Sequence, residues 1–321
     1  MEKGYASEAY RRMCRIREFD LLVHDYAARD YRIMALMHSA IGGEAYSVAA
    51  MMNISAEDYM ATTYRNHAHT IAKDVDLNAL AAELCGKDAG CCRGKGGNMH
   101  AVDQNAHIIA GFGIIAAGLP SCLGTAFAAQ YKGTNGLTVG FFGDGAIAQG
   151  AYHESMNLAA IWRLPVLFIN DNNRYAMSTA TCANLVSEDT IQYAKNYNIP
   201  AITVDGMDFF AVDAAVKIAV AHIRGGNGPY FLECKSYRYH GQFEGDPQIY
   251  KPQDEVDYYW SRDPLILFEG EAVKRSLLTT EEMSAIREKA KKDVLAAFDY
   301  AEACPLPELC EVFTNVYSDK Y

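Results

Sequence analysis

One stretch, residues 137–179, constrains the fold more than any other part of the chain. Leu137 to Phe142 form an apolar run with β-branched residues, which is typical of a strand buried on both faces. The Gly143-Asp144-Gly145 turn ends this run, a helix is predicted from about Ala148 to Trp162, and Pro165 to Ile169 form a second apolar run. Two parallel strands joined by one helix make a right-handed crossover, so both strand ends are expected to open onto the same edge of a sheet.

Polar side chains follow both predicted strands. Asp144 follows the first and Asn173 follows the second, so we expect the two to lie side by side. A carboxylate, a side-chain amide oxygen and a loop carbonyl suit Mg²⁺ or Ca²⁺, and Mg²⁺ often keeps phosphate oxygens as further ligands. A helix beginning just past Gly145 would offer free N–H groups to that anion. These residues predict a metal-bridged diphosphate site, whereas the GDG turn alone would indicate only an ordinary turn.

Seven segments carry a resemblance to a known family. In chain order they are YRNH at Tyr64–His67, AAELCGK with GKGGNMH (81–100), GFGIIAAGLP (111–120), GDGAIAQG (143–150), NDNNRYAMST (170–179), VDG (204–206) and YRYHGQFEGDPQIY (237–250). The chain resembles the alpha subunit of the thiamine diphosphate-dependent 2-oxoacid and acetoin dehydrogenases over nearly its whole length. The FEGD segment is more similar to the acetoin dehydrogenase alpha subunits than to the serine-bearing loop of mitochondrial pyruvate dehydrogenases.

The resemblance and the alternation of strands with helices predict the same fold class. This is an α/β fold with a doubly wound, mostly parallel sheet, the thiamine diphosphate-binding fold, extended by helices at both ends. We expect one domain over residues 1–321, with helical ends at about 1–60 and 262–321.

What the resemblance implies for the site is a set of contacts to thiamine diphosphate and Mg²⁺. By role these are Asp144, Asn173 and the carbonyl of Tyr175 as metal ligands, Gly145 and Ala146 as donors of turn N–H groups, Tyr64 and Arg65 as diphosphate ligands, and Gly113 and Ile115 as backbone contacts near the pyrimidine. His67 is the leading acid–base candidate, with a purely structural histidine as the alternative. The alternative for Tyr64 and Arg65 is also structural: Tyr64 would pack in the core, and Arg65 would lie at the surface.

The chain departs from the family pattern at several positions on the substrate side. Gln242 stands where the family has a catalytic histidine, and His240, two residues earlier, cannot simply replace it. A glutamine can form hydrogen bonds but cannot carry a proton. Four more residues differ from the usual family residue, namely Gly43, Phe112, Ala116 and Ala148. Because the predicted metal ligands are intact, we infer that cofactor binding is retained and that the substrate or reaction has shifted.

Three functions remain open from the sequence. The first is an alpha subunit that cleaves acetoin or decarboxylates a 2-oxoacid and passes the acyl group to lipoyl. It would work only with a beta subunit, in a heterotetramer of two alpha and two beta chains, and with a lipoyl acyltransferase as a possible further partner. The second is a transketolase-like or carboligating enzyme without lipoyl. The third is a catalytically weak subunit that binds cofactor and stabilises its partner.

Composition excludes several other classes. The formal net charge of −11 argues against nucleic acid as a partner, because binding phosphates needs clustered Lys and Arg. No apolar run approaches the ~18 residues of a membrane span, and the N-terminus is too charged for a signal peptide. Nine scattered cysteines suit reduced thiols in a cytoplasmic protein.

Two alternative sites are weak. A zinc cluster could be imagined from Cys85, Cys91, Cys92, His67, His69 and His100, but no CxxC or HxxxH spacing supports it, and buried thiols are the better interpretation. The GCCRGKGG segment is superficially similar to a P-loop, but Gly90 and Gly94 are one residue too close and Gly96 stands where Ser or Thr should bind magnesium.

The rest of the chain predicts further elements by periodicity and capping. Helices are expected over about 7–29, 44–52, 76–84, 119–131, 209–223 and from Thr279 to about Phe298, strands over 201–204 and 229–234, and loops over 87–99 and 237–252. Ser55-x-x-Asp58 resembles a capping arrangement before another turn. We also expect 237–252 and the loop after Tyr175 to be mobile when the site is empty, because their anchors would be the ligand and the other subunit.

Overall fold

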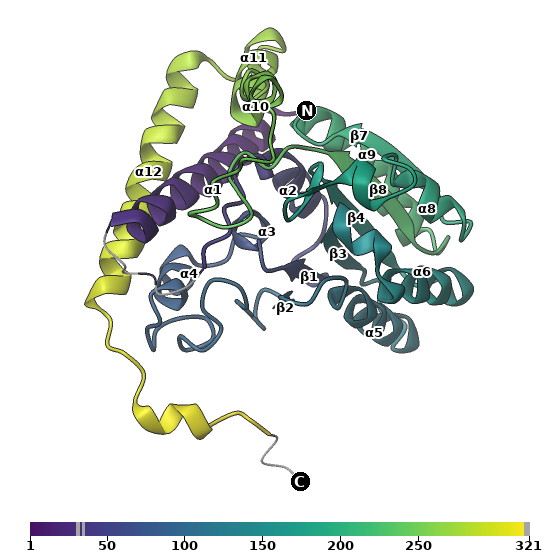
Figure 1. The fold of residues 1–321 in the computed structure, drawn as a ribbon, viewed down its shortest axis with the longest axis horizontal. Coiled ribbons are helices and arrows are strands. Elements are labelled where there is room, and N and C mark those ends of the chain that lie inside the picture. The colour runs from purple at the N-terminus through teal and green to yellow at the C-terminus, as the bar shows by residue number, and fades with distance from the viewer. Residues whose placement is uncertain (30–32, 34–35, 318–321) are drawn as a thin grey trace.

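A six-stranded parallel sheet organises the molecule (Figure 1). The computed structural model describes residues 1–29, 33 and 36–317. The strand order is β2-β1-β3-β4-β8-β7, and a separate antiparallel pair, β5-β6, lies beyond the sheet. The strands are β1 (Tyr59–Thr63), β2 (Ile108–Phe112), β3 (Thr138–Gly143), β4 (Val166–Asn172), β5 (Tyr175–Ala176), β6 (Thr179–Ala180), β7 (Ala201–Asp205) and β8 (Tyr230–Lys235).

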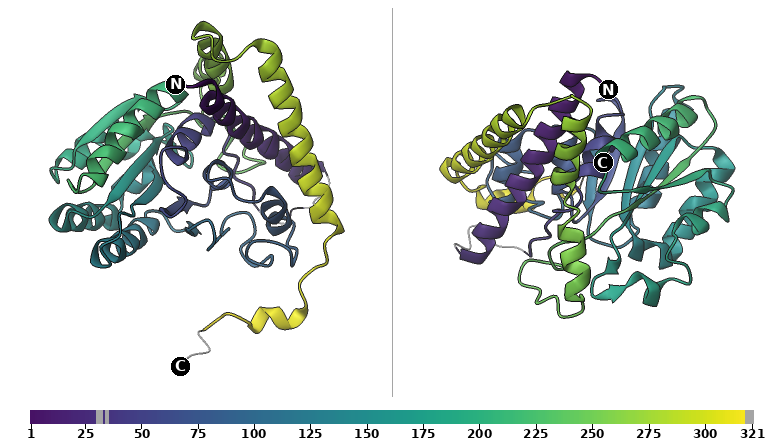
Figure 2. Two further views of the ribbon diagram at one scale, coloured as in Figure 1. Left: turned by 180° about the vertical axis from the view of Figure 1, so that it is seen from behind. Right: turned by 90° about the horizontal axis from the view of Figure 1, so that it is seen from above.

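Helices cover both faces of the sheet (Figure 2). They are α1 (Lys3–Arg29), α2 (Glu44–Met51), α3 (His67–Ala72), α4 (Leu77–Leu84), α5 (Gly118–Tyr131), α6 (Gly150–Trp162), α7 (Thr181–Asn184), α8 (Ile191–Lys195), α9 (Phe209–Arg224), α10 (Gln253–Trp260), α11 (Pro264–Lys274) and α12 (Thr280–Ala303), with 3₁₀ turns at η1 (Asp144–Ala148) and η2 (Leu309–Phe313). The predicted doubly wound α/β fold is confirmed.

Two hydrophobic cores, one on each face, result from the alternation of side chains along the strands. In β3, Phe141 packs into the core beneath α2 and α9, while Phe142 packs into the core with α5 and α6. In β4, Ile169 packs into the same core as Phe141, and Phe168 packs into the same core as Phe142. Both strands are therefore buried on both faces, as their continuous apolar runs predict.

The register of the central pair positions the site. Gly143 of β3 lies opposite Asp171 of β4, so the polar residues after these positions leave the sheet at the same edge. The chain between the two strands differs slightly from the prediction. Residues 144–148 form the 3₁₀ turn η1, and α6 begins at Gly150 instead of Ala148.

The terminal helices pack on one another. α1 lies against α12 in both views of Figures 1 and 2, with the rings of Phe19 and Phe298 5.2 Å apart. α12 begins with a capping box, in which Thr279 and Glu282 exchange side-chain and backbone hydrogen bonds.

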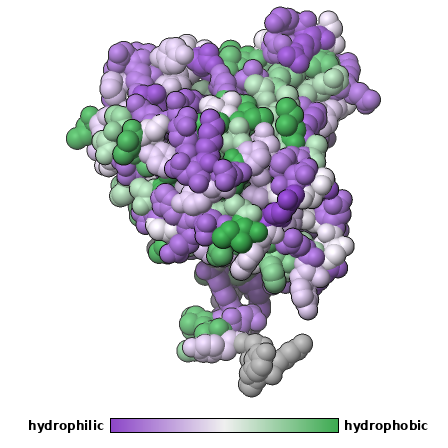
Figure 3. All heavy atoms as spheres, turned by 90° about the vertical axis from the view of Figure 1, so that its right-hand side faces the viewer, coloured by the Kyte–Doolittle hydropathy of each residue, from purple (hydrophilic) through white to green (hydrophobic). Residues whose placement is uncertain are grey.

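The segment after α12 extends away from the body of the molecule (Figure 1). It carries exposed apolar side chains, which are Leu306, Leu309, Val312, Phe313, Val316 and Tyr317. On the face drawn in Figure 3, apolar residues occur in small scattered groups and recur on this segment. Within the described residues, no helix is both long and apolar enough to cross a bilayer.

Candidate active site at the strand ends

A cavity of about 750 Å³ opens where β3 and β4 end. Every residue predicted to bind cofactor or metal lines this cavity, namely Tyr64, Arg65, Gly113, Ile115, Asp144, Gly145, Ala146, Asn173 and Tyr175. Gln242 lines it as well. Its other walls include residues that the prediction did not assign, among them His38, His69, Met99, His100, Asp171 and Arg238. His67 is not among the lining residues.

Asp144 is a buried carboxylate without a basic partner. Its side chain is almost fully buried and accepts a 2.6 Å hydrogen bond from Thr181. Burial raises the pKa of Asp144 to about 6. Among the described residues no Lys or Arg forms an ion pair with it, so a bound cation would supply the missing charge. Asp144 therefore fits a role as a metal ligand.

Asn173 and Asp171 add further oxygens at the same edge. The Asn173 amide donates to Asp171 Oδ2 at 2.9 Å, and Asn173 Oδ1 accepts from the Tyr175 backbone N–H at 3.3 Å. The Tyr175 carbonyl accepts a 3.2 Å hydrogen bond from Arg238. Asp171 was missed by the sequence analysis, although it lies within the quoted NDNN segment.

Two guanidinium groups, those of Arg65 and Arg238, line the same cavity. Arg65 donates to the backbone carbonyls of Ser39 and Gln242, and Arg238 donates to carbonyl, amide and hydroxyl oxygens. Burial and the nearby Arg238 guanidinium lower the pKa of Arg65. Arg238 Nε is buried without a hydrogen-bond partner in the described part of the chain. Neither guanidinium group forms an ion pair with a carboxylate among the described residues, and two cations close together suit an anionic group such as a diphosphate.

The glycine after Asp144 permits the hairpin β5-β6 to approach the turn. A Cβ added at Gly145 would lie only 2.8 Å from the Cβ of Ala176, closer than side chains approach one another. This close approach brings Tyr175 and Ala176 to the cavity wall beside η1. A glycine is therefore required here by packing, as well as by any contact between its N–H and a ligand.

Gln242 bridges two lining residues. Its Oε1 accepts from Arg238 at 2.8 Å, and its Nε2 donates to the Tyr64 hydroxyl at 2.8 Å. The side chain thus uses an acceptor and a donor at once, which an amide can do without changing its protonation state. Gln242 fixes the positions of Arg238 and Tyr64.

His67 lies outside the cavity lining, and its side chain is fully buried. Its Nδ1 forms a 2.6 Å hydrogen bond with Asp20, and its Nε2 has no partner among the described residues. Asp20 also accepts from the backbone of Ala40, beside the Ser39 carbonyl that receives Arg65. This placement favours the structural alternative, in which His67 supports the 39–40 turn.

His100 is the histidine that reaches the cavity from the GKGGNMH segment. Its Nδ1 lies 2.8 Å from the Gly111 carbonyl, and its ring packs against Gly113. Because a carbonyl only accepts, Nδ1 carries the hydrogen and Nε2 is left as the acceptor nitrogen. The quoted GKGGNMH motif contained this histidine, but nothing in the sequence ranked it above His67.

Two more lining histidines are held neutral. Burial and the nearby Arg65 lower the pKa of His38 to about 4 and that of His69 to about 3. His38 bonds the Gln242 carbonyl through Nδ1, and His69 stacks on Phe141 with ring centroids 3.8 Å apart. Neutral rings add no further positive charge beside the two arginines.

We expect the free energy of unfolding to fall as the pH drops from about 6.5 towards 4. In that window the unfolded chain takes up protons on these histidines, whereas the folded chain does not, because its histidine pKa values are depressed. Denaturant titrations at pH 7.5 and 5 measure the loss. In His38→Gln the loss between the two pH values should be smaller than in the unmodified protein, and an equal loss would contradict this assignment.

The alternative zinc cluster is not assembled. In the part of the chain that the structure describes, Cys91 and Cys92 group with Glu83, and not with His67, His69 or His100. Glu83 is fully buried and already accepts four backbone N–H groups at 2.7–2.9 Å, from Cys92, Gly94, Gly96 and Gly97. The glycine-rich segment thus folds around an internal carboxylate, which explains its superficial likeness to a phosphate-binding loop.

Ala116 keeps a backbone conformation that glycine favours. It lines the cavity with φ of 65°, in the left-handed region. An alanine there costs roughly 1 kcal/mol relative to glycine. The backbone at this position therefore has a conformation that suits the usual family glycine, although the residue here is alanine.

Comparisons with known proteins identify the family of this chain. The sequence profile of the dehydrogenase E1 component family matches residues 10–310. The acetoin:2,6-dichlorophenolindophenol oxidoreductase alpha subunits of Bacillus subtilis and Cupriavidus necator are 37% and 38% identical, over 96% and 99% of this chain and 92% and 95% of theirs. The pyruvate dehydrogenase E1 alpha subunit of Rhizobium meliloti is 36% identical over 96% of this chain and 89% of its own. The chain therefore belongs to the dehydrogenase E1 component family, as an alpha subunit of its thiamine diphosphate-dependent oxidoreductases.

Proposed function

We propose that this chain, with Mg²⁺ and a separate beta subunit, cleaves acetoin or decarboxylates a 2-oxoacid and delivers the acyl group to a lipoyl acceptor. The observation that carries the proposal is the cavity at the ends of β3 and β4, where the buried Asp144 carboxylate and the guanidinium groups of Arg65 and Arg238 form no ion pair with any described residue. The names of the relatives, which are acetoin and pyruvate enzymes, support the choice of substrates.

Different residues of this chain would hold the metal, the diphosphate and the ring system of the cofactor. Asp144, Asn173 and the Tyr175 carbonyl would hold Mg²⁺, whose charge would offset that of the diphosphate. Arg65 and Tyr64 would bind the diphosphate, and we add Arg238 to this group. Gly113 and Ile115 would meet the ring system at the apolar wall.

When bound, thiamine diphosphate supplies a nucleophilic carbon that stabilises negative charge after cleavage of a bond next to a carbonyl. The apolar part of the cavity wall would limit the access of water to the bound cofactor, and His100, which lines the cavity, would act as a proton carrier through Nε2. Gln242 orients Arg238 and Tyr64 and carries no proton itself. His100 therefore takes the acid–base role first given to His67.

Reconstitution with candidate substrates tests the proposal. The chain is mixed with its beta partner, thiamine diphosphate and Mg²⁺, and acetoin, pyruvate and sugar phosphates are compared with and without an artificial electron acceptor. Reduction of the acceptor with acetoin or pyruvate supports the proposed dehydrogenase. Product formed from sugar phosphates without acceptor would instead indicate a transketolase-like enzyme, and cofactor binding without any product would indicate a catalytically weak subunit.

Replacing Gln242 by alanine is expected to lower kcat at least about 10-fold. The substitution removes hydrogen bonds to Arg238 and Tyr64 at 2.8 Å each, and each contributes roughly 1 kcal/mol. Steady-state kinetics of the reconstituted enzyme measure the change. The matched control is Gln253→Ala, because Gln253 is exposed at the start of α10, and its kcat should stay unchanged. Equal rates in the two variants would show that the bridge is dispensable.

A further inference from the structure

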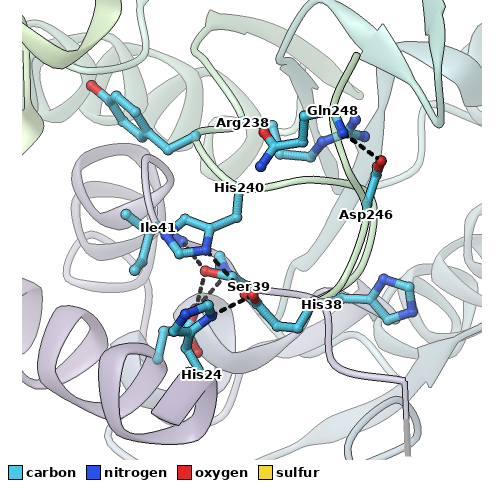
Figure 4. Close-up of polar contacts among 12 residues, drawn as sticks. His24, His38, Ser39, Ile41, Arg238, His240, Asp246 and Gln248 are labelled. Atoms are coloured by element: carbon cyan, nitrogen blue, oxygen red, sulfur yellow. Dashed lines mark hydrogen bonds and ion pairs between the residues drawn. The ribbon is translucent and has the colours of Figure 1, made fainter. Parts of the chain in front are cut away.

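Three metal-binding side chains converge on the outer side of the loop that carries Gln242. His24 of α1 and His240 of the loop point toward one another (Figure 4), with ring centroids 5.3 Å apart. Glu244 lies between them, with one carboxylate oxygen 2.5 Å from His24 Nδ1 and the other 3.1 Å from His240 Nδ1. One ligand atom from each of the three residues lies within 4.8 Å of the other two. None of the three lines the cavity, so the cluster is separate from the cofactor site.

Two imidazoles and one carboxylate form a common protein ligand set for Zn²⁺ with an open fourth position. Tetrahedral Zn²⁺ with bonds of 2.0–2.1 Å needs ligand atoms about 3.3 Å apart. The two histidine-to-carboxylate separations, 2.5 and 3.1 Å, are somewhat shorter than that value, and all three ligand atoms lie within 4.8 Å of one another. Small side-chain movements would therefore open the cluster enough to hold an ion. The ion would replace the hydrogens now shared between the histidines and Glu244.

The three backbone segments are held in place without a metal. His24 lies on the long helix α1. The backbone N–H of Glu244 donates to the Met37 carbonyl at 2.8 Å, and Lys251 donates to the His240 carbonyl at 2.9 Å. An ion would therefore find its ligands already arranged, which lowers the ordering cost of binding.

The surroundings allow an ion to enter. His24 has a side-chain exposure of 42%, whereas those of His240 and Glu244 are 19% and 10%. Water can therefore occupy the fourth position on the His24 side. The other possible metal-binding group among the described residues consists of Cys91, Cys92 and Glu83. Its carboxylate already accepts four backbone N–H groups, so it is less available to an ion.

From this arrangement we propose that His24, His240 and Glu244 form a Zn²⁺ site that ties the 237–252 loop to α1. The loop contributes Gln242 and Arg238 to the cavity, so an ion on its outer side would restrain the segment that shapes the inner side. The site uses nitrogen ligands and therefore differs in metal preference from the oxygen-rich site proposed at Asp144, where Mg²⁺ would bind.

Calorimetric titration of the full chain, assembled with its beta subunit, tests the site with Zn²⁺ as the probe. We expect one more high-affinity Zn²⁺ per chain in the unmodified protein than in His24→Gln. The affinity should fall more than about 100-fold in that variant, since even changes outside the ligand set cost 10–100-fold. The matched control is His222→Gln, which removes a half-buried histidine from another helix, α9, and should leave uptake unchanged.

Two further measurements separate this site from the alternatives. Co²⁺ in place of Zn²⁺ should give visible absorption bands without the intense thiolate-to-cobalt absorption in the near ultraviolet, and these bands should be lost in Glu244→Gln. Zn²⁺ should slow hydrogen exchange in residues 237–252, and Mg²⁺ should not slow it in the absence of thiamine diphosphate. Equal Zn²⁺ uptake by His24→Gln and the unmodified protein, or a thiolate spectrum, would overturn the proposal. These readouts need no turnover, so they are independent of the proposed reaction.

Discussion

In Asp144→Asn, Mg²⁺-dependent binding of thiamine diphosphate is expected to weaken at least about 100-fold. Asparagine keeps the size of the side chain but removes the negative charge that a divalent cation needs. In the structure Asp144 is the buried carboxylate at the end of β3, and burial already raises its pKa to about 6. The neutral variant removes this cost of burial, so the fold should be as stable as before. Calorimetry of the assembled enzyme with Mg²⁺ present and absent gives the affinity.

The matched control for this prediction is Asp189→Asn. Asp189 is an exposed carboxylate that pairs with Lys235 away from the cavity lining. Its replacement should leave cofactor affinity unchanged. If Asp144→Asn binds the cofactor as tightly as Asp189→Asn does, Asp144 is not a metal ligand.

The second large effect is expected on stability, in Arg17→Met. Arg17 is buried and forms ion pairs with Glu44 at 2.6 Å and with Asp263 at 2.8 Å, joining α1 to α2 and to the start of α11. The pKa of Glu44 is raised because the effect of burial is larger than the opposing effect of the Arg17 charge. Without the guanidinium, two buried carboxylates lose their partner, and removing one member of a buried ion pair costs about 3–5 kcal/mol. Urea unfolding with a common slope measures this loss.

An exposed ion pair supplies the comparison. Arg287 pairs with Glu18 at 3.3 Å and has a side-chain exposure of 47%. Arg287→Met should cost less than about 1 kcal/mol. A loss in Arg17→Met no larger than that in Arg287→Met would mean that the buried network does not hold the terminal helices in place.

The sequence predicted the central crossover well because its pattern is local and unambiguous. β3, α6 and β4 alternate as apolar run, turn and helix within one continuous stretch. It did not predict β1, whose YMATT sequence is short and only partly apolar, so that Ser55 and Asp58 suggested a capping turn. In the structure they form that turn, with Asp58 bonding the Ser55 N–H, and a strand follows it.

The second kind of miss came from segments without an apolar stripe. α10 is only eight residues long and none of them is fully buried, so it offers few positions from which a hydrophobic period can be recognised. α3 is only six residues long, and β5 and β6 have two residues each and pack against η1 and α7. These elements depend on tertiary contacts that a linear pattern does not contain.

Many residues of the cavity lining could be predicted because the resemblance carries them in fixed motifs. What it could not give is which histidine faces the cavity. His67 and His100 both lie in quoted motifs, yet His67 is turned inward to a buried Asp20 from α1, and His100 lines the cavity. The pairing of Gln242 with Arg238 and Tyr64 likewise joins residues far apart in sequence.

A crystal structure of the assembled enzyme with thiamine diphosphate and Mn²⁺, a Mg²⁺ substitute with a strong anomalous signal, tests the central claim most directly. We predict one anomalous peak at the ends of β3 and β4, within bonding distance of Asp144, Asn173 and the Tyr175 carbonyl, with the diphosphate on its other side. A peak away from these oxygens, or a diphosphate bound elsewhere, would contradict the account.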